Sequence, residues 1–255
     1  MVPLFDTHVH LDFLPDLPTA LARADAAGVG RFVVPGVSLI QCRRLPALAA
    51  ESAAILIAPG LHPLHADEWG ESFAAELEHL LEHPHAVAVG EVGLDRNSRS
   101  PAVNQERLLR RLIGLARNLG KPLLIHQRRA IGRVLEILRQ ERADGVGGIL
   151  HAFSGSLESA RQAIDLGFAL GIGGVVTHPQ SRRLPELVRQ LPADWLVLET
   201  DAPDLPPHPH RGSDNRPEYL PLIAARVAEL RHWSRDDTAR ITSGNAARIL
   251  GLAAD

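Results

Sequence analysis

Residues Pro122-Leu123-Leu124-Ile125-His126 form a short apolar run that ends in a histidine, and an amphipathic stretch follows at 129–141. The same unit, an apolar run followed by a stretch rich in Ala, Leu and Arg, recurs along the whole chain. Some runs, such as Leu196-Val197-Leu198, are apolar at every position, so both faces of the strand must be covered. The repeat therefore predicts parallel strands that alternate with helices.

Eight such units are expected within the 255 residues. The strand candidates are 4–9, 31–35, 54–59, 86–90, 122–126, 147–151, 168–173 and 195–199. The helix candidates are 17–28, 39–51, 70–82, 104–119, 129–141, 156–166, 182–191, 217–230 and 235–250. Eight βα units in a chain of this length predict an α/β fold of the (β/α)8 or TIM-barrel type, rather than an open doubly wound sheet.

The chain is expected to form a single domain over residues 1–255. No run of Gly, Ser or Pro is long enough to serve as a linker between domains. The segment 204–211, rich in proline and histidine, follows the eighth strand and is interpreted as a functional loop.

Composition excludes several classes of protein. No apolar run approaches the roughly 20 residues that span a bilayer, and the first residues lack the features of a secretory signal. The single cysteine, Cys42, argues for a reducing compartment and excludes thiolate zinc sites. A net charge of −3 argues against a protein that coats nucleic acid electrostatically. We therefore expect a cytoplasmic protein with no membrane association.

Side chains able to bind a metal follow the ends of five predicted strands. In a barrel the carboxyl ends of the strands meet at one mouth, where active sites form. His8 and His10 are two residues apart on one strand, so they point to the same face. The other candidates end the fourth, fifth, sixth and eighth strands: Glu91, His126, His151 and Asp201.

Imidazole and carboxylate ligands without thiolate suit zinc, manganese, iron, nickel or magnesium. Six candidate ligands exceed what one tetrahedral ion needs, so we expect two divalent ions about 3.5–4 Å apart. Glu91 is predicted to bridge them, with His8 and His10 completing one ion and His126 and His151 the other.

Asp201 and Glu199 share a face at the end of the eighth strand. Asp201 is predicted to bind metal and to accept the proton of the attacking water. Glu199 is expected to orient a histidine or the water, and a strand-end carboxylate satisfied by backbone N–H groups is an equally good interpretation. The only lysine, Lys121, begins the fifth strand, away from the ligand end, which disfavours a lysine as the metal bridge.

These motifs together resemble the TatD family of metal-dependent hydrolases, in order, from residue 6 to about residue 250. They comprise Asp6-Thr7-His8-Val9-His10-Leu11-Asp12, Gly60-Leu61-His62-Pro63, Gly90-Glu91-Val92-Gly93-Leu94-Asp95, His126-Gln127-Arg128-Arg129-Ala130, His151-Ala152-Phe153-Ser154-Gly155-Ser156, Glu199-Thr200-Asp201-Ala202-Pro203, Asn215-Arg216-Pro217-Glu218 and Asn245-Ala246-Ala247-Arg248. The resemblance implies a TIM-barrel phosphodiesterase that depends on divalent metal and acts on DNA, as a 3′-5′ exonuclease or deoxyribonuclease. Position by position, it matches the six candidates above to metal-site residues, and His62 and Glu199 to active-site residues.

The leading hypothesis is hydrolysis of a phosphodiester by a water molecule that two ions, Mg²⁺, Mn²⁺, Zn²⁺ or Ni²⁺, activate. The substrate would be DNA, single-stranded or at a 3′ end, and no obligate protein partner is expected. His62 would donate to a phosphate oxygen or the leaving group, or else hold a structural hydrogen bond. Arg128 and Arg216 are predicted to bind phosphate, because a planar guanidinium offers paired donors.

Two other functions stay open at this point. An amidohydrolase or lactonase would use the same two ions to attack a carbonyl carbon, and it would keep its activity without Arg128 and Arg216. A metal-binding scaffold without enzymatic activity is the second alternative.

Overall fold

Parallel strands form the centre of the structure, a computed structural model that describes residues 2–253. Within that range the strands pair in chain order, with β1 to β3 in one parallel sheet and β4 to β8 in another. Their bounds are β1 (Leu4–Asp6), β2 (Val29–Pro35), β3 (Ile55–Ala58), β4 (Val89–Asp95), β5 (Leu123–Arg128), β6 (Gly148–Leu150), β7 (Phe168–Ile172) and β8 (Leu196–Leu198).

Backbone hydrogen bonds join the two sheets into a closed barrel. The N–H of Thr7 donates to the Leu198 carbonyl at 3.0 Å, which links the end of β1 to β8. On the other side, the N–H of Val87 donates to the Ile57 carbonyl of β3 at 3.0 Å, just before β4. The predicted α/β barrel is therefore confirmed.

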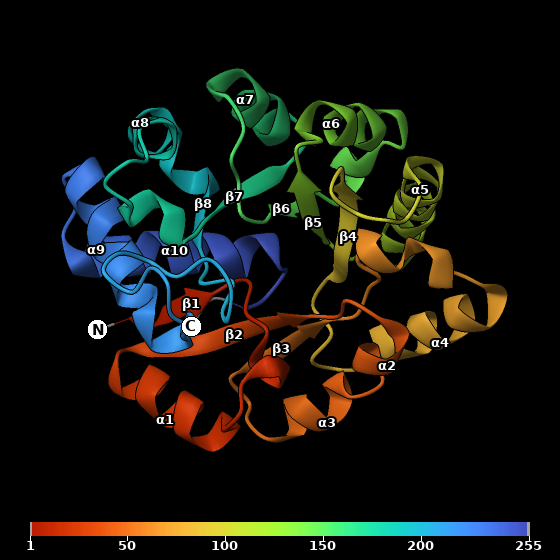
Figure 1. Cartoon of the computed structure of the whole chain (residues 1–255), viewed down its shortest axis with the longest axis horizontal. Helices are drawn as coiled ribbons and strands as arrows, with labels where there is room; N and C mark the ends of the chain where they lie inside the picture. Colours follow the sequence, from red (N-terminus) through yellow and green to blue (C-terminus); the bar gives the residue numbers. More distant parts are fainter. Residues whose placement is uncertain (1, 254–255) are drawn as a thin grey trace.

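Helices surround the strands, as Figure 1 shows. They are α1 (Leu17–Ala26), α2 (Leu39–Cys42), α3 (Leu45–Ala50), α4 (Glu71–Leu81), α5 (Ala102–Leu119), α6 (Ile131–Gln140), α7 (Leu157–Asp165), α8 (Arg183–Gln190), α9 (Leu220–Arg231) and α10 (Arg235–Ile249). Among the described residues, no helix is both long and apolar enough to cross a membrane.

Some element boundaries differ from those predicted. The expected helix over 39–51 is two short helices, α2 and α3. Pro46 lies in the first turn of α3, where backbone N–H groups have no partner within the helix, so its missing N–H does not break a helical hydrogen bond. The fourth strand runs to Asp95 instead of ending at residue 90, since it pairs with β5 as far as Arg128. The first strand ends at Asp6, and the histidines after it lie on irregular backbone.

The core has two layers. Alternate residues of β5 belong to different layers. Leu124 faces the barrel interior, whereas Leu123 and Ile125 pack outward under the helices. The interior cluster also includes Ala246 and Leu250 of α10. The amide of Asn245 on the same helix donates to the Leu196 carbonyl at the start of β8, at 2.9 Å. Helix α10 therefore covers the amino-terminal end of the barrel and leaves the carboxyl end for the site.

Candidate metal centre

The predicted ligands meet at the carboxyl mouth of the barrel. On one side, Nε2 of His8 lies 3.3 Å from Glu91 Oε2 and 3.5 Å from Asp201 Oδ1. Nε2 of His10 lies 4.0 Å and 3.7 Å from the same two oxygens. All four side chains are buried.

The other oxygen of Glu91 faces three further histidines. Glu91 Oε1 lies 2.6 Å from Nδ1 of His126, 3.3 Å from Nε2 of His151 and 3.6 Å from Nε2 of His62. The two carboxylate oxygens of Glu91 thus point toward different sets of imidazoles. A carboxylate in this position is able to bridge two ions.

Among the described residues, three groups of side chains have ligand atoms close enough to hold an ion, because the atoms of each group lie within 4.8 Å of one another. They are His8 with His10 and Asp201, His8 with Glu91 and His151, and His62 with Glu91 and His126. This grouping differs from the predicted division, in which His126 and His151 shared an ion. The rings of His8 and His151 stack with centroids 3.8 Å apart, so His151 lies beside His8 rather than with His126 alone.

Unpartnered nitrogen atoms provide a test of whether the site fits a metal. Buried polar side-chain atoms almost always have a hydrogen-bond partner. Here, among the described residues, both ring nitrogens of His8, Nδ1 of His10, Nε2 of His126 and Nδ1 of His151 are buried without one. Of these atoms, Nε2 of His8 is the one that faces the two predicted carboxylate ligands, 3.3 Å from Glu91 and 3.5 Å from Asp201. A buried imidazole nitrogen without a hydrogen-bond partner between two carboxylates suits a divalent cation.

Burial and mutual charge set the protonation of the two carboxyl groups. Burial alone would raise the pKa of Glu91, but the facing imidazoles of His8 and His151 outweigh it and hold that pKa well below its usual range. Burial raises the pKa of Asp201 to about 7, opposed by His151 and reinforced by Glu91. Glu91 is therefore the firmly ionised member of the pair, as its predicted role of a bridging ligand would require.

His62 differs from the other histidines in its tautomer. Its Nδ1 accepts a hydrogen bond from the N–H of Leu64 at 3.1 Å, so this nitrogen carries no proton in the neutral ring. Burial lowers the pKa of His62 to about 4, which keeps the ring neutral. The proton must then be on Nε2, the atom that faces Glu91. In this state His62 is a hydrogen-bond donor toward the site and lacks the free lone pair that a metal ligand needs.

Glu199 contacts both the backbone and a histidine. Its Oε1 accepts a hydrogen bond from the N–H of Ala152 at 2.5 Å and lies 3.5 Å from Nδ1 of His151. Gly171 leaves room for this carboxylate, because a Cβ there would lie 2.2 Å from Glu199 Oε2. Both interpretations of Glu199 that the sequence left open thus have a matching contact.

Two carboxyl groups near the site were missed in the sequence. Asp95 Oδ2 lies 3.5 Å from Nε2 of His126. Asp6 is fully buried and accepts two hydrogen bonds from Thr200. A signal was present for both, since Asp6 precedes His8 by two residues and Asp95 follows Glu91 by four, positions that share a face in an extended strand.

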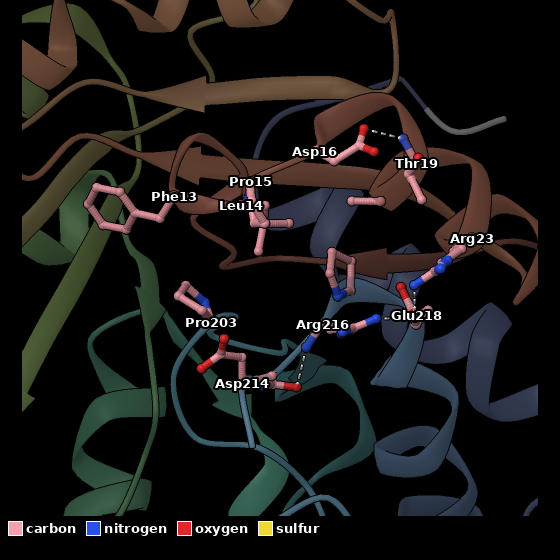
Figure 2. Close-up of a pocket in the computed structure, with 13 residues that line it drawn as sticks. Phe13, Leu14, Pro15, Asp16, Thr19, Arg23, Pro203, Asp214, Arg216 and Glu218 are labelled. Atoms are coloured by element: carbon pink, nitrogen blue, oxygen red, sulfur yellow. Dashed lines mark hydrogen bonds and ion pairs between the residues drawn. The ribbon is translucent and has the colours of Figure 1, made fainter. Parts of the chain in front are cut away.

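The two arginines predicted to bind phosphate lie at the rim. Arg128 ends β5 and is exposed. Arg216 lines a cavity of about 400 Å³, and its guanidinium is 3.6 Å from Glu218. Figure 2 shows Phe13 at one end of this cavity and Arg216 and Glu218 toward the other, together with Arg23. The ring of Phe13 stacks on His10, with centroids 5.3 Å apart. The role of both arginines stays a prediction.

A cluster of buried imidazoles and carboxylates at the mouth of a (β/α)8 barrel defines a class, the metal-dependent barrel hydrolases. The model of one family, TatD related DNase, matches residues 5–251. The chain therefore belongs to the TatD family and is a TatD-related metal-dependent hydrolase.

Relatives match nearly the whole length of the chain. The uncharacterized metal-dependent hydrolase YabD of Bacillus subtilis is 39% identical, over 98% of this chain and 99% of its own length. The 3′-5′ ssDNA/RNA exonuclease TatD of Edwardsiella piscicida is 35% identical, over 94% and 95%. The crystal structure of YjjV, a TatD homologue of Escherichia coli, matches with a TM-score of 0.93 at 33% identity and covers 99% of this chain and 100% of that chain.

Proposed function

We propose that the protein is a metal-dependent phosphodiesterase that removes nucleotides from the 3′ end of single-stranded DNA. The observation that carries the proposal is the position of Glu91, whose two oxygens face separate sets of histidines. The relative from Edwardsiella piscicida, described as a 3′-5′ ssDNA/RNA exonuclease, supports the choice of nucleic acid as substrate.

The predicted ligands, His8, His10, Glu91, His126, His151 and Asp201, would hold two divalent ions, and Glu91 would contribute to both. Such ions would supply positive charge that acidifies a water molecule and neutralises phosphate oxygens. The remaining steps fall to the chain's own side chains. Asp201, at the edge of the cluster, would accept the proton of the attacking water.

His62 is the proposed hydrogen-bond donor to the leaving group. Its Nε2–H faces the site, and the Leu64 N–H fixes that tautomer. Because the ring is neutral, it would donate a hydrogen bond to the leaving oxygen as the bond to phosphorus breaks, and that oxygen would take its proton from solvent. Glu199 would position His151 through the contact between Oε1 and Nδ1.

A metal-reconstitution assay tests the proposal. The protein is stripped of metal and then given Mg²⁺, Mn²⁺, Zn²⁺ or Ni²⁺ separately. Each form is assayed on 5′-labelled single-stranded DNA beside a copy blocked at its 3′ end. We expect stepwise shortening of the open strand alone. Equal cleavage of both strands would exclude the exonuclease, and Glu91→Gln is expected to lose both metal and activity.

Hydrolysis of a carbonyl substrate is the alternative that this assay must separate. Variants Arg128→Ala and Arg216→Ala should each lower the rate on DNA by about tenfold or more if they bind phosphate. An amidohydrolase or lactonase would instead turn over amides or lactones and would keep that activity in both variants.

A further inference from the structure

A second cavity lies beside the metal centre, between the loops that follow β6, β7 and β8. Its volume is about 330 Å³, within the range of about 300–1,000 Å³ of small-ligand pockets. Its walls combine apolar side chains with polar ones, among them Ser154, Val175, Arg182, Arg183, Leu184 and Leu205.

One end of this cavity lies next to the proposed metal centre. Ala152, which lines it, follows His151 in the chain. The N–H of Ala152 donates to Glu199, the carboxylate that also faces His151. A ligand in the cavity would therefore lie next to the phosphate on which the metal centre acts.

Charge distinguishes this cavity from the one in Figure 2. The cavity beside His151 is lined by Arg182 and Arg183, and no acidic residue is among its described lining residues. The cavity beside Phe13 has two arginines as well, but three acids also line it: Asp16, Asp214 and Glu218. Its two guanidinium groups both lie within 3.7 Å of Glu218. An anion is therefore favoured in the cavity beside His151.

The apolar wall of the cavity is held in place by the loop after β8. Leu205, 39% exposed, stands on a segment that packs closely against Gly174, where a Cβ would lie 2.3 Å from the Leu205 carbonyl oxygen. The N–H of His208 donates to Thr177 Oγ1 at 2.8 Å. These contacts join the loops after β7 and β8, so the wall exists before a ligand arrives.

We propose that this cavity is a nucleotide subsite, which holds the nucleotide next to the scissile phosphodiester. The base would lie against Leu205, Leu184 and Val175, and its own phosphate would bind Arg182 and Arg183. The proposal rests on the function proposed above, and it identifies the nucleotide whose base and phosphate contribute to substrate binding.

The test compares three dinucleotides on the metal-loaded enzyme: TpT, pTpT and TpTp. All three contain the same scissile bond. In addition, pTpT has a phosphate at its 5′ end and TpTp has one at its 3′ end. We expect kcat/KM about tenfold higher for pTpT than for TpT, whereas TpTp, whose 3′ end is blocked by its phosphate, should be cleaved no faster than TpT. In Arg182→Gln/Arg183→Gln this ratio should fall to near one, chiefly through KM.

The matched control is Arg189→Gln/Arg240→Gln. It removes two exposed arginines that pair with acids on their own helices, outside both cavities. The control should keep the preference for pTpT. An unchanged ratio in the Arg182/Arg183 variant, or an equal loss in the control, would overturn the subsite.

Calorimetric binding of thymidine 5′-monophosphate (TMP) separates the subsite from the reaction. The Arg182/Arg183 variant should bind TMP about tenfold more weakly and thymidine as the wild type does. Leu205→Ser should weaken TMP but leave 2-deoxyribose 5-phosphate unchanged. If these effects occur although no diester is hydrolysed, the subsite stands and the proposed function fails. If diesters are hydrolysed while TMP binds equally to all variants, only the subsite fails.

Discussion

Thr200 donates its backbone N–H to Asp6 Oδ1 at 2.9 Å and its hydroxyl to Asp6 Oδ2 at 2.6 Å, so one carboxyl group joins the ends of β1 and β8. Both residues are fully buried. Asp6 precedes His8 by two residues and Thr200 directly precedes Asp201, so the pair is next in the chain to two of the predicted metal ligands. Closure of the barrel and placement of these ligands thus depend on the same contact.

Replacing Thr200 by Val should leave Asp6 with an unsatisfied buried oxygen. We expect a loss of about 1–3 kcal/mol in the free energy of unfolding, measured by urea titration of the metal-free protein. Thr200→Ser keeps the hydroxyl and loses one buried methyl, a cost of about 1 kcal/mol. Thr200→Val at the stability of the wild type would show that the hydroxyl contact contributes nothing.

Gly171 should resist substitution because of Glu199. Ala at this position would place its Cβ 2.2 Å from Oε2 of Glu199, and displacing that carboxylate should cost about 1–3 kcal/mol and lower activity. Gly173→Ala is the control for stability, since its nearest Glu199 atom would be 3.6 Å away. Urea titration should find Gly173→Ala within about 0.5 kcal/mol of the wild type. Tolerance of Ala at 171 would contradict the tight packing.

His62 and His126 should respond differently to replacement by Gln. If His62 donates a hydrogen bond to the leaving oxygen, His62→Gln should keep the bound metal and lose about 10²-fold or more in kcat. His126→Gln should instead lower the metal content, measured by inductively coupled plasma mass spectrometry on dialysed protein. Metal loss in the His62 variant would make His62 a ligand and would refute the tautomer derived from Leu64.

The single cysteine offers a measurement of pH dependence away from the site. Burial raises the pKa of the Cys42 thiol to about 12, and the thiol donates to the Gly60 carbonyl. Because the folded-state pKa exceeds the unfolded value of 9.0, the protonated thiol contributes full stability below pH 9, and this is lost as pH rises toward 12.

Wild type and Cys42→Ala should therefore differ in their response to alkaline pH. The stability difference between them should change by up to about 1.4 kcal/mol per pH unit above pH 9, at the expense of the wild type. A thiol reagent at pH 8 should label the folded protein slowly and the protein in urea rapidly. Rapid labelling of the folded form would contradict the burial of Cys42.

Local pattern was enough to predict the barrel and to bring its candidate ligands to one mouth. Apolar runs such as Leu123-Leu124-Ile125, each followed by an amphipathic stretch, specify strand and helix through side-chain periodicity, which is read within a few residues. Parallel strands all end at one mouth, so His126 at the end of such a run had to lie there. For the same reason Glu91 and Asp201 were predicted together although they are far apart in the chain.

Only the tertiary structure decided which groups face one another. His8 stacks on His151, Glu91 divides its two oxygens between sets of histidines, and the Leu64 N–H selects the proton position on His62. Periodicity states which face a side chain occupies, but its partner depends on the stagger of the strands and on loop geometry. The sequence by itself therefore determined the barrel and its candidate ligands, and the folded chain determined their pairing and the different charge of the two cavities beside them.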